Sequence, residues 1–312
     1  MYYKKPTDVL GVLNGRKVKK PTPLRFTNNS DSESSVSFTG LSADIRYKLN
    51  GNGDYTQWNG SAIALQPGQF VEMVGDNGTR ISISSQHFEI DGQLAASGSI
   101  MSLVSSAKII KTIPQVDDFF GYLFYGCTGL TAAPELPATA LAEGCYTSMF
   151  YGCTGLTAAP ELPATALAGY CYTSMFFECT GLTAAPELPA TALAEGCYSF
   201  MFSDCTGLTA APELPATALA EGCYNSMFYG CTGLTAAPEL PATALADECY
   251  SSMFYGCTGL TSIEVSFDEW VEVATDYWVV DVDFSGTFTC PAGLEQIFDE
   301  SHIPTGWTVV TK

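Results

Sequence analysis

Residues 131–142 read TAAPELPATALA, and the same twelve letters return at 157–168, 183–194, 209–220 and 235–246. The period is 26 residues, and the full unit, FYGCTGLTAAPELPATALAEGCYTSM at 124–149, occurs five times before a sixth copy stops after Leu260. Self-similarity at such a period is typical of solenoids and propellers, in which each unit buries its apolar face against its neighbours. The repeat therefore predicts a stacked array.

Charge divides the chain into two unequal parts. The net charge is −20, yet residues 1–111 hold twelve Lys/Arg against nine Asp/Glu, and residues 112–312 hold Lys312 alone against 24 Asp/Glu. So acidic an array should repel nucleic acid and anionic membranes. No run approaches the ~20 apolar residues of a transmembrane segment, and no signal peptide is visible at the start. Either the chain is not exported by the general route, or its signal has been removed.

Residues 1–20 are predicted to be a basic arm, with one strand pair around the Asn14-Gly15 turn. Its cations are concentrated in Arg16, Lys17, Lys19 and Lys20. Two interpretations remain open: an arm that docks on an acidic partner, or a solvated terminus.

Residues 21–92 are predicted to form a small β-sandwich. Short segments with alternating or β-branched residues predict strands at 24–27, 36–39, 45–49, 63–65, 70–73, 81–84 and 88–90. The run Asn50-Gly51-Asn52-Gly53-Asp54 predicts a tight hairpin turn. A calcium loop would need a glycine and a glutamate where the chain has Tyr55 and Ser61, so the hairpin is the better interpretation.

Residues 93–123 join this module to the array. Their serines and glycines suit a flexible linker, whereas the apolar Ile100, Met101, Leu103 and Val104 favour a packed N-terminal cap. Residues 261–312 are predicted to be a β-rich C-terminal cap, with strands at 265–267, 277–282 and 287–290. Its tryptophans are Trp270, Trp278 and Trp307.

Within the repeat, residues 143–153 predict a helix. Five positions are identical in all copies, namely Cys145, Tyr146, Met149, Phe150 and Cys153, and at 100° per residue they cover one arc, while the varying positions cover the other. In the first copy Phe119 and Leu123 stand at the Cys and Met positions, as suits a capping turn.

After this segment the chain should return in an extended path. Leu130, Leu136 and Leu141 are its predicted inward residues. Pro134 and Pro137 cannot donate ladder hydrogen bonds, so any strand is limited to about 130–133.

The repeat at 124–260 resembles the bacterial leucine-rich repeats of the BspA-like type, which carry an F-x-x-C-x-x-L core. That core stands here at Phe124/Cys127/Leu130, Phe150/Cys153/Leu156, Phe176/Cys179/Leu182, Phe202/Cys205/Leu208, Phe228/Cys231/Leu234 and Phe254/Cys257/Leu260. The resemblance extends more loosely to the predicted β-sandwich at 21–92 and to the predicted C-terminal cap at 261–312. It implies a curved solenoid that binds rather than catalyses, on surface or phage-fibre proteins associated with gut bacteria. The expected fold class is thus α+β: a β-sandwich, a leucine-rich-repeat-type solenoid and a β-rich cap.

Eleven of the twelve cysteines form two rows at the 26-residue period, and the twelfth is Cys290. Cys145 and Cys153 would lie about 12 Å apart along a helix, too far for a disulfide bond. The spacings match no zinc signature. Buried thiols are the favoured interpretation, with some disulfides or a metal site as alternatives, and no metal or cofactor is expected.

The repeat also places glutamates in a row: Glu135, Glu161, Glu187, Glu213 and Glu239. If adjacent coils stack near strand spacing, five like charges stand close together. They could form a cation- or glycan-binding stripe, or an exposed polar row that keeps the repeat soluble, which is the favoured interpretation.

No catalytic motif appears: there is no G-x-S-x-G, H-E-x-x-H, phosphate loop or dinucleotide fingerprint. We therefore expect a non-enzymatic recognition protein. The second candidate surface is the varying face of the predicted helix, where aromatic residues suit an interface: Tyr170, Phe177, Phe200 and Tyr255.

The expected partner is a protein or glycan on a bacterial surface, with the N-terminal part docked on a virion or envelope assembly. The favoured setting is a phage fibre or virion surface, and the alternatives are a bacterial cell-surface adhesin or a structural spacer. Whether the chain forms a homo-oligomer is left open.

Overall fold

The N-terminal module consists of two sheets. The computed structural model describes residues 10–13 and 16–312, with side chains from Lys20 onward. One sheet has the order β11-β10-β3-β8-β5-β6 and the other β7-β4-β9. Their strands are β3 (Leu24–Thr27), β4 (Ser34–Phe38), β5 (Arg46–Leu49), β6 (Thr56–Gln57), β7 (Ile63–Leu65), β8 (Phe70–Val74), β9 (Phe88–Asp91), β10 (Leu94–Ser97) and β11 (Leu130–Ala132).

The two sheets share a buried core. Phe26 on β3 contacts Phe88 on β9 with ring centroids 5.1 Å apart, and Phe88 contacts Phe38 on β4 at 4.9 Å. Six of the seven predicted strands are present within about two residues. The strand predicted at 81–84 is wrong: only an isolated bridge between Ile83 and Gln86 occurs there.

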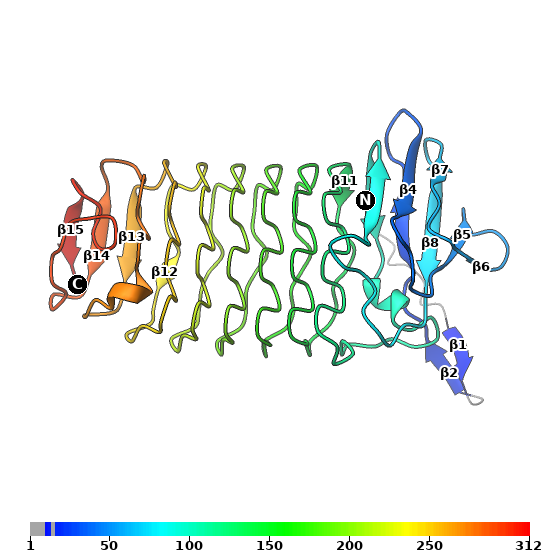
Figure 1. Ribbon diagram of the computed structural model, residues 1–312, viewed down its shortest axis with the longest axis horizontal. Helices are drawn as coiled ribbons and strands as arrows, with labels where there is room; N and C mark the ends of the chain where they lie inside the picture. Colours follow the sequence, from blue (N-terminus) through cyan, green and yellow to red (C-terminus); the bar gives the residue numbers. More distant parts are fainter. Residues whose placement is uncertain (1–9, 14–15) are drawn as a thin grey trace, which may run out of the picture.

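Both predicted strand pairs are present, but the second along the chain has a longer loop than a tight hairpin turn, since its last paired residues are Tyr47 and Thr56. β5 pairs antiparallel with β6 across the Asn50–Asp54 turn, where Asn50, Gly51 and Gly53 have positive φ. β1 (Leu10–Leu13) pairs with β2 (Arg16–Lys19) around residues 14–15, and those two residues lie outside the described residues, as do residues 1–9. Figure 1 shows this β1–β2 hairpin at the N-terminal end of the molecule, away from the repeats.

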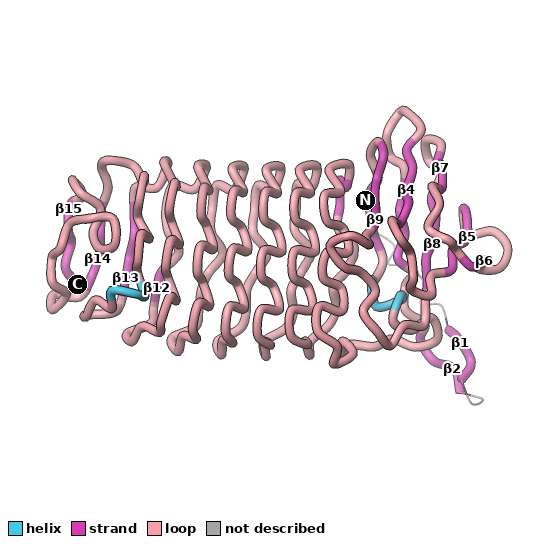
Figure 2. Tube along the Cα trace, in the orientation of Figure 1, coloured by secondary structure: helices cyan, strands magenta, loops and turns pink. Residues whose placement is uncertain are grey.

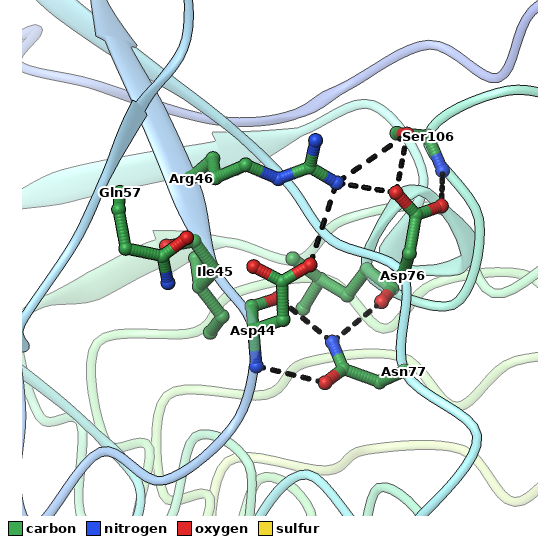
Figure 3. Close-up of polar contacts among 8 residues, drawn as sticks. Asp44, Ile45, Arg46, Gln57, Asp76, Asn77 and Ser106 are labelled. Atoms are coloured by element: carbon green, nitrogen blue, oxygen red, sulfur yellow. Dashed lines mark hydrogen bonds and ion pairs between the residues drawn. The ribbon is translucent and has the colours of Figure 1, made fainter.

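The segment at 93–123 is packed, not a flexible linker. It contains β10 and the 3₁₀ helix η1 (Ile100–Leu103), whose four residues are all buried. Hydrogen bonds tie η1 to the module, because the Asn77 amide donates to the carbonyls of Leu103 and Asp44 (Figure 3).

Beside it, Asp76 accepts hydrogen bonds from Ser106 and forms an ion pair with Arg46 (Figure 3). Partial burial acts to raise the pKa of Asp76, but these contacts outweigh it and hold the pKa below its ordinary value. The cluster is structural: it fixes the loop after η1 to the sheet.

The repeats continue directly from the six-stranded sheet. β11, in the first repeat, pairs parallel with β10, and the buried residues of the module and the repeats form one continuous core. From there successive 26-residue coils stack side by side along the long axis of the molecule (Figures 1 and 2).

The helix predicted at 143–153 is wrong. Among the described residues the only helices are η1 and the 3₁₀ helix η2 (Glu272–Ala274), so the α part of the α+β class does not hold and the fold is β-rich. Neither is long and apolar enough to cross a membrane.

Residues 143–153 instead form a chain of overlapping turns, which we call the turn ribbon. Every second amide donates within the ribbon to the carbonyl three residues back, as Met149 does to Tyr146. The amides between them donate to the next coil: Tyr146 to Cys171, Ser148 to Thr173 and Phe150 to Met175, at 2.9–3.0 Å. Ribbons at 169–179, 195–205, 221–231 and 247–257 repeat this pattern. A parallel ladder thus joins the coils without regular strands.

The expected burial within the ribbon is correct although the conformation is not. Cys145, Tyr146, Met149, Phe150 and Cys153 are all at most 1% exposed. In the ribbon two residues point inward and two outward, a period of four, whereas a helix has a period of 3.6. The two periods differ by only 40° every four residues, so an eleven-residue window cannot separate them.

Stacked rings measure the coil spacing, because rings in equivalent conformations are related by the coil-to-coil displacement at their own position. Inward Phe rings at 150, 176, 202, 228 and 254 are 5.5–5.9 Å apart and inward Tyr rings at 146 to 250 are 5.7–6.0 Å apart. Outward rings on the same ribbons are only 4.7–4.8 Å apart. The stack therefore curves, with the turn ribbons on its inner side.

The opposite side carries the A-P-E-L-P segments and is correspondingly wide. In the middle coils the amides of Glu161, Glu187 and Glu213 have no backbone partner. The predicted short strand exists only in the first repeat, as β11, and β12 (Glu239–Leu240) pairs near the other end. Leu130, Leu136 and Leu141 are buried as predicted.

The C-terminal segment continues the stack. β12, β13 (Ser262–Val265), β14 (Thr287–Cys290) and β15 (Thr308–Thr311) form a parallel sheet in that order. The strand predicted at 265–267 begins earlier, as β13. The one predicted at 277–282 is wrong: these residues form another turn ribbon, with Phe254 donating to Trp278 and Gly256 to Val280. Trp278, in this ribbon, and Trp307, just before β15, are both buried.

Candidate recognition surfaces

Two surfaces of the stack run the length of the repeats. The proline face consists of residues 133–137, 159–163, 185–189, 211–215 and 237–241. The turn face consists of the outward residues of the turn ribbons. The predicted glutamate row lies on the proline face, and the four predicted aromatic residues lie on the turn face.

The glutamates of the row, at 135, 161, 187, 213 and 239, are all exposed. Between consecutive coils the proline face is grooved, and three such grooves have volumes of about 320, 450 and 400 Å³. Each groove has the same lining: Ala, Pro, Glu, Leu and Pro from one coil and Pro, Glu and Pro from the next. No group of three or more His, Cys, Asp or Glu side chains in the described part of the chain is arranged to hold a metal ion.

The turn face carries stacked rings. Phe177 stacks on Tyr151 at 4.7 Å, and Tyr151 stacks on Tyr125 at 4.8 Å. Tyr255 stacks on Tyr229, also at 4.8 Å. Tyr125, Tyr151 and Tyr229 are not among the predicted residues, although an aromatic residue stands at this position in five of six copies of the repeat.

This row of rings is interrupted once, at Ser203. The Ser203 hydroxyl is buried and has no hydrogen-bond partner, which is unusual for a buried polar group. Next to it lies Asp204, whose pKa is raised by partial burial and by the neighbouring Glu178 carboxylate.

Three rows of the turn face have left-handed backbone, four residues apart in each ribbon. Most members are Gly or Ser, such as Gly144, Ser148 and Gly152 with φ of 58°, 51° and 68°. Such φ values are costly for residues with large side chains, by about 1–2 kcal/mol each. Towards the two ends of the stack, larger residues with left-handed backbone are Asp118, Tyr122, Glu248, Tyr277 and Asp281. In the middle of the stack four more lie in two adjacent coils: Tyr170 (φ 54°), Glu178 (57°), Phe200 (56°) and Asp204 (57°).

Two of these residues expose aromatic surface. Tyr170 is 41% exposed and Phe200 is 38% exposed. The Tyr170 ring lies over Gly196 of the next coil, where an added Cβ would meet a ring carbon at 2.4 Å. Its hydroxyl donates to Glu195, and this bond, more than burial and the nearby carboxylates, raises the pKa of Tyr170. We call Tyr170, Phe177, Glu178, Phe200, Ser203 and Asp204 the central turn-face cluster.

Not all predicted residues come together. Phe177 belongs to this cluster, whereas Tyr255 lies further along the stack against Tyr229. The basic residue Lys20 is exposed, and the side chains of Arg16, Lys17 and Lys19 lie outside the described side chains.

All twelve cysteines are buried and free. The thiols of Cys153, Cys179, Cys205, Cys231 and Cys257 donate to the carbonyl of the Phe one coil earlier, at 3.0–3.1 Å. Burial raises the pKa of Cys145 and Cys179 to about 12. Thiols held neutral in this way are poor nucleophiles and poor metal ligands, so the rows pack the core.

A further cavity lies at the C-terminal end, with a volume of about 610 Å³. Its lining includes Asp281, Asp283, Asp299 and Glu300 together with Phe284, which is 86% exposed. None of the predicted binding residues lines it.

Comparison with known proteins adds no assignment: no family model, no curated protein and no solved structure matches this chain.

Proposed function

We propose that this chain is a non-enzymatic recognition protein, a leucine-rich-repeat-type solenoid that binds a bacterial surface through its turn face. The setting that we favour is a phage fibre or virion surface, in which the N-terminal part docks on the particle. A bacterial cell-surface adhesin and a structural spacer are the alternatives.

The observation that carries the proposal is the concentration of sterically costly residues in two coils. Tyr170, Glu178, Phe200 and Asp204 replace Gly or Ser at left-handed positions, and neighbouring coils fold with the smaller residues. Strain retained in the middle of the stack, between two coils that carry only Gly and Ser in these rows, is a reason to infer function there. Exposed aromatic rings among carboxylates suit a ligand that offers apolar surface and hydrogen-bond donors, such as a glycan or a protein loop.

The repeat itself supplies a clean test. Tyr170→Gly, Glu178→Gly, Phe200→Ser and Asp204→Gly convert the two coils to residues that their neighbours already carry at the same positions. This variant should fold at least as well as the original chain but should lose binding to intact gut-bacterial cells, measured by pull-down and by flow cytometry of labelled protein.

A control removes exposed apolar side chains elsewhere: Leu49→Ser, Ile109→Ser and Val310→Ser, whose residues are 40–46% exposed. It should bind as the original chain does. Unchanged binding by the four-residue variant would rule out the turn face. If the original chain binds no cells at all, recognition fails and the spacer alternative takes its place.

A further inference from the structure

The proline face is suited to an extended chain that runs along the stack. Its grooves recur once per coil, each with an apolar lining and a glutamate on either edge. The inward Tyr rings of successive coils are 5.7–6.0 Å apart, and the grooves lie on the side of the stack that has fewer hydrogen bonds between coils. Alternate side chains of an extended peptide recur every 6.6–6.8 Å or so. Every second residue of such a peptide therefore meets one coil.

The negative charge of the glutamate row requires that this peptide carry cations. The exposed glutamate row has no cation near it in sequence, because residues 112–311 contain no Lys or Arg. None of the ion pairs found in the described residues involves Glu135, Glu161, Glu187, Glu213 or Glu239. An extended segment with cations at alternate positions would place one positive charge at each glutamate.

The chain itself contains such a segment. Residues 16–20 read RKVKK, and residues 1–20 hold six of the thirteen Lys/Arg against a single acidic residue, Asp8. The backbone of Arg16–Lys19 is already extended, as β2, and pairs only with β1. Figure 1 shows this hairpin at the N-terminal end of the molecule and away from the repeats, so in this arrangement it does not lie along the proline face of its own stack.

We infer that the basic arm of one copy docks on the proline face of a second copy, with its lysines on the glutamate row. The contact joins two different surfaces, so it is heterologous and builds head-to-tail chains rather than closed pairs. It is independent of the turn face, which stays free for recognition.

Sedimentation velocity of the full chain at low salt tests this. The original chain should form species larger than a dimer as its concentration rises, and 0.5 M NaCl should weaken the association about tenfold or more, because the contact is ionic. Two variants should each stay monomeric: an arm variant (Arg16→Gln, Lys17→Gln, Lys19→Gln, Lys20→Gln) and a row variant (Glu161→Gln, Glu187→Gln, Glu213→Gln). A control with the same charge change, Glu143→Gln, Glu195→Gln and Glu221→Gln, alters exposed residues beside the turn face and should associate as the original does.

Mixing the two monomeric variants gives the decisive measurement. The arm variant supplies an intact row and the row variant supplies an intact arm, so the mixture should form 1:1 dimers and nothing larger. A monomeric original chain, a control variant that associates as weakly as the row variant, or a mixture that stays monomeric would each overturn the inference.

Discussion

The turn face and the proline face come from the same 26-residue unit but hold the coils together by different means. On the turn face every second amide of a ribbon donates to the next coil. On the proline face of the middle coils the glutamate amides have no backbone partner, and neighbouring coils leave grooves between them. The hydrogen-bonded side is therefore short and the other side long, which produces the curvature.

The same difference explains which positions of the repeat vary between copies. Backbone groups make the contacts of the turn face, so its outward side chains change between copies: Ser148 is replaced by Phe200, and Gly152 by Glu178. The segment TAAPELPATALA is identical in all five copies. Along this segment only isolated parallel bridges join the coils, such as Ala140 to Ala166 and Ala166 to Ala192, so the shapes of Ala, Pro and Leu help to set the spacing and a change alters the fit.

The largest expected effect is the loss of folding stability at high pH, where the buried thiols of the turn ribbons ionise. Burial raises the pKa of the ribbon thiols above the ordinary 9.0, to about 12 for Cys145, Cys179 and Cys257. Such groups contribute stability that is fully present below the unfolded pKa and is lost as pH rises from about 9 towards the folded pKa. Each thiol adds a slope of up to about 1.4 kcal/mol per pH unit.

We therefore expect cooperative unfolding between about pH 9 and 11, followed by circular dichroism and by denaturant titration at each pH. Cys179→Ala removes one titrating thiol, so the slope of the unfolding free energy against pH should fall by up to about 1.4 kcal/mol per pH unit. A stability that stays level up to pH 11 would show that the thiol rows do not limit the fold.

The next largest effect separates the two sides of one ribbon. Phe176 is fully buried between Phe150 and Phe202, with centroids at 5.5 and 5.7 Å. Phe176→Ala should reduce the free energy of unfolding by about 3–5 kcal/mol. The adjacent Phe177 points outward and stacks only on Tyr151 among the aromatic rings, so Phe177→Ala should lose about 1 kcal/mol. Equal losses in urea unfolding would contradict the assignment of inner and outer sides.

Much of this arrangement was predictable from the sequence. The period, the buried set of each repeat and six strands of the module follow from hydrophobic patterning, because burial is what that pattern encodes. The conformation of the ribbon was missed because a period of four imitates a helix over a short window. The recurrent glycines at 144, 152, 196, 222 and 230 contradicted a helix, since each costs about 1 kcal/mol there.

The candidate surfaces were predictable in part. The glutamate row follows from the period alone, and Tyr170 and Phe200 from comparison of the copies. That these two aromatics stand in left-handed backbone, and that the buried Ser203 hydroxyl has no partner, depends on the ribbon geometry. The cavity at the C-terminal end depends on how the last turns pack, and no local pattern indicates it.

The smallest expected losses of stability are those for alanine substitutions at two glycines, which the repeat requires for different reasons. Gly181 follows the ribbon, where the chain turns towards the proline face, and an added Cβ would lie 2.3 Å from the Thr154 carbonyl of the preceding coil. Gly222 lies within a ribbon at φ 57°, with no atom within 4 Å of an added Cβ. Gly181→Ala must push two coils apart and should lose about 2–3 kcal/mol.

Gly222→Ala should lose about 1 kcal/mol, because the left-handed conformation costs roughly 1–2 kcal/mol and the stiffer unfolded chain returns part of it. Denaturant unfolding of both variants gives the comparison directly. If Gly222→Ala proves the more costly, the turn conformation of the ribbons limits the stack. If Gly181→Ala does, the limit is the close approach of one coil to the next, as the ladder on the turn face requires.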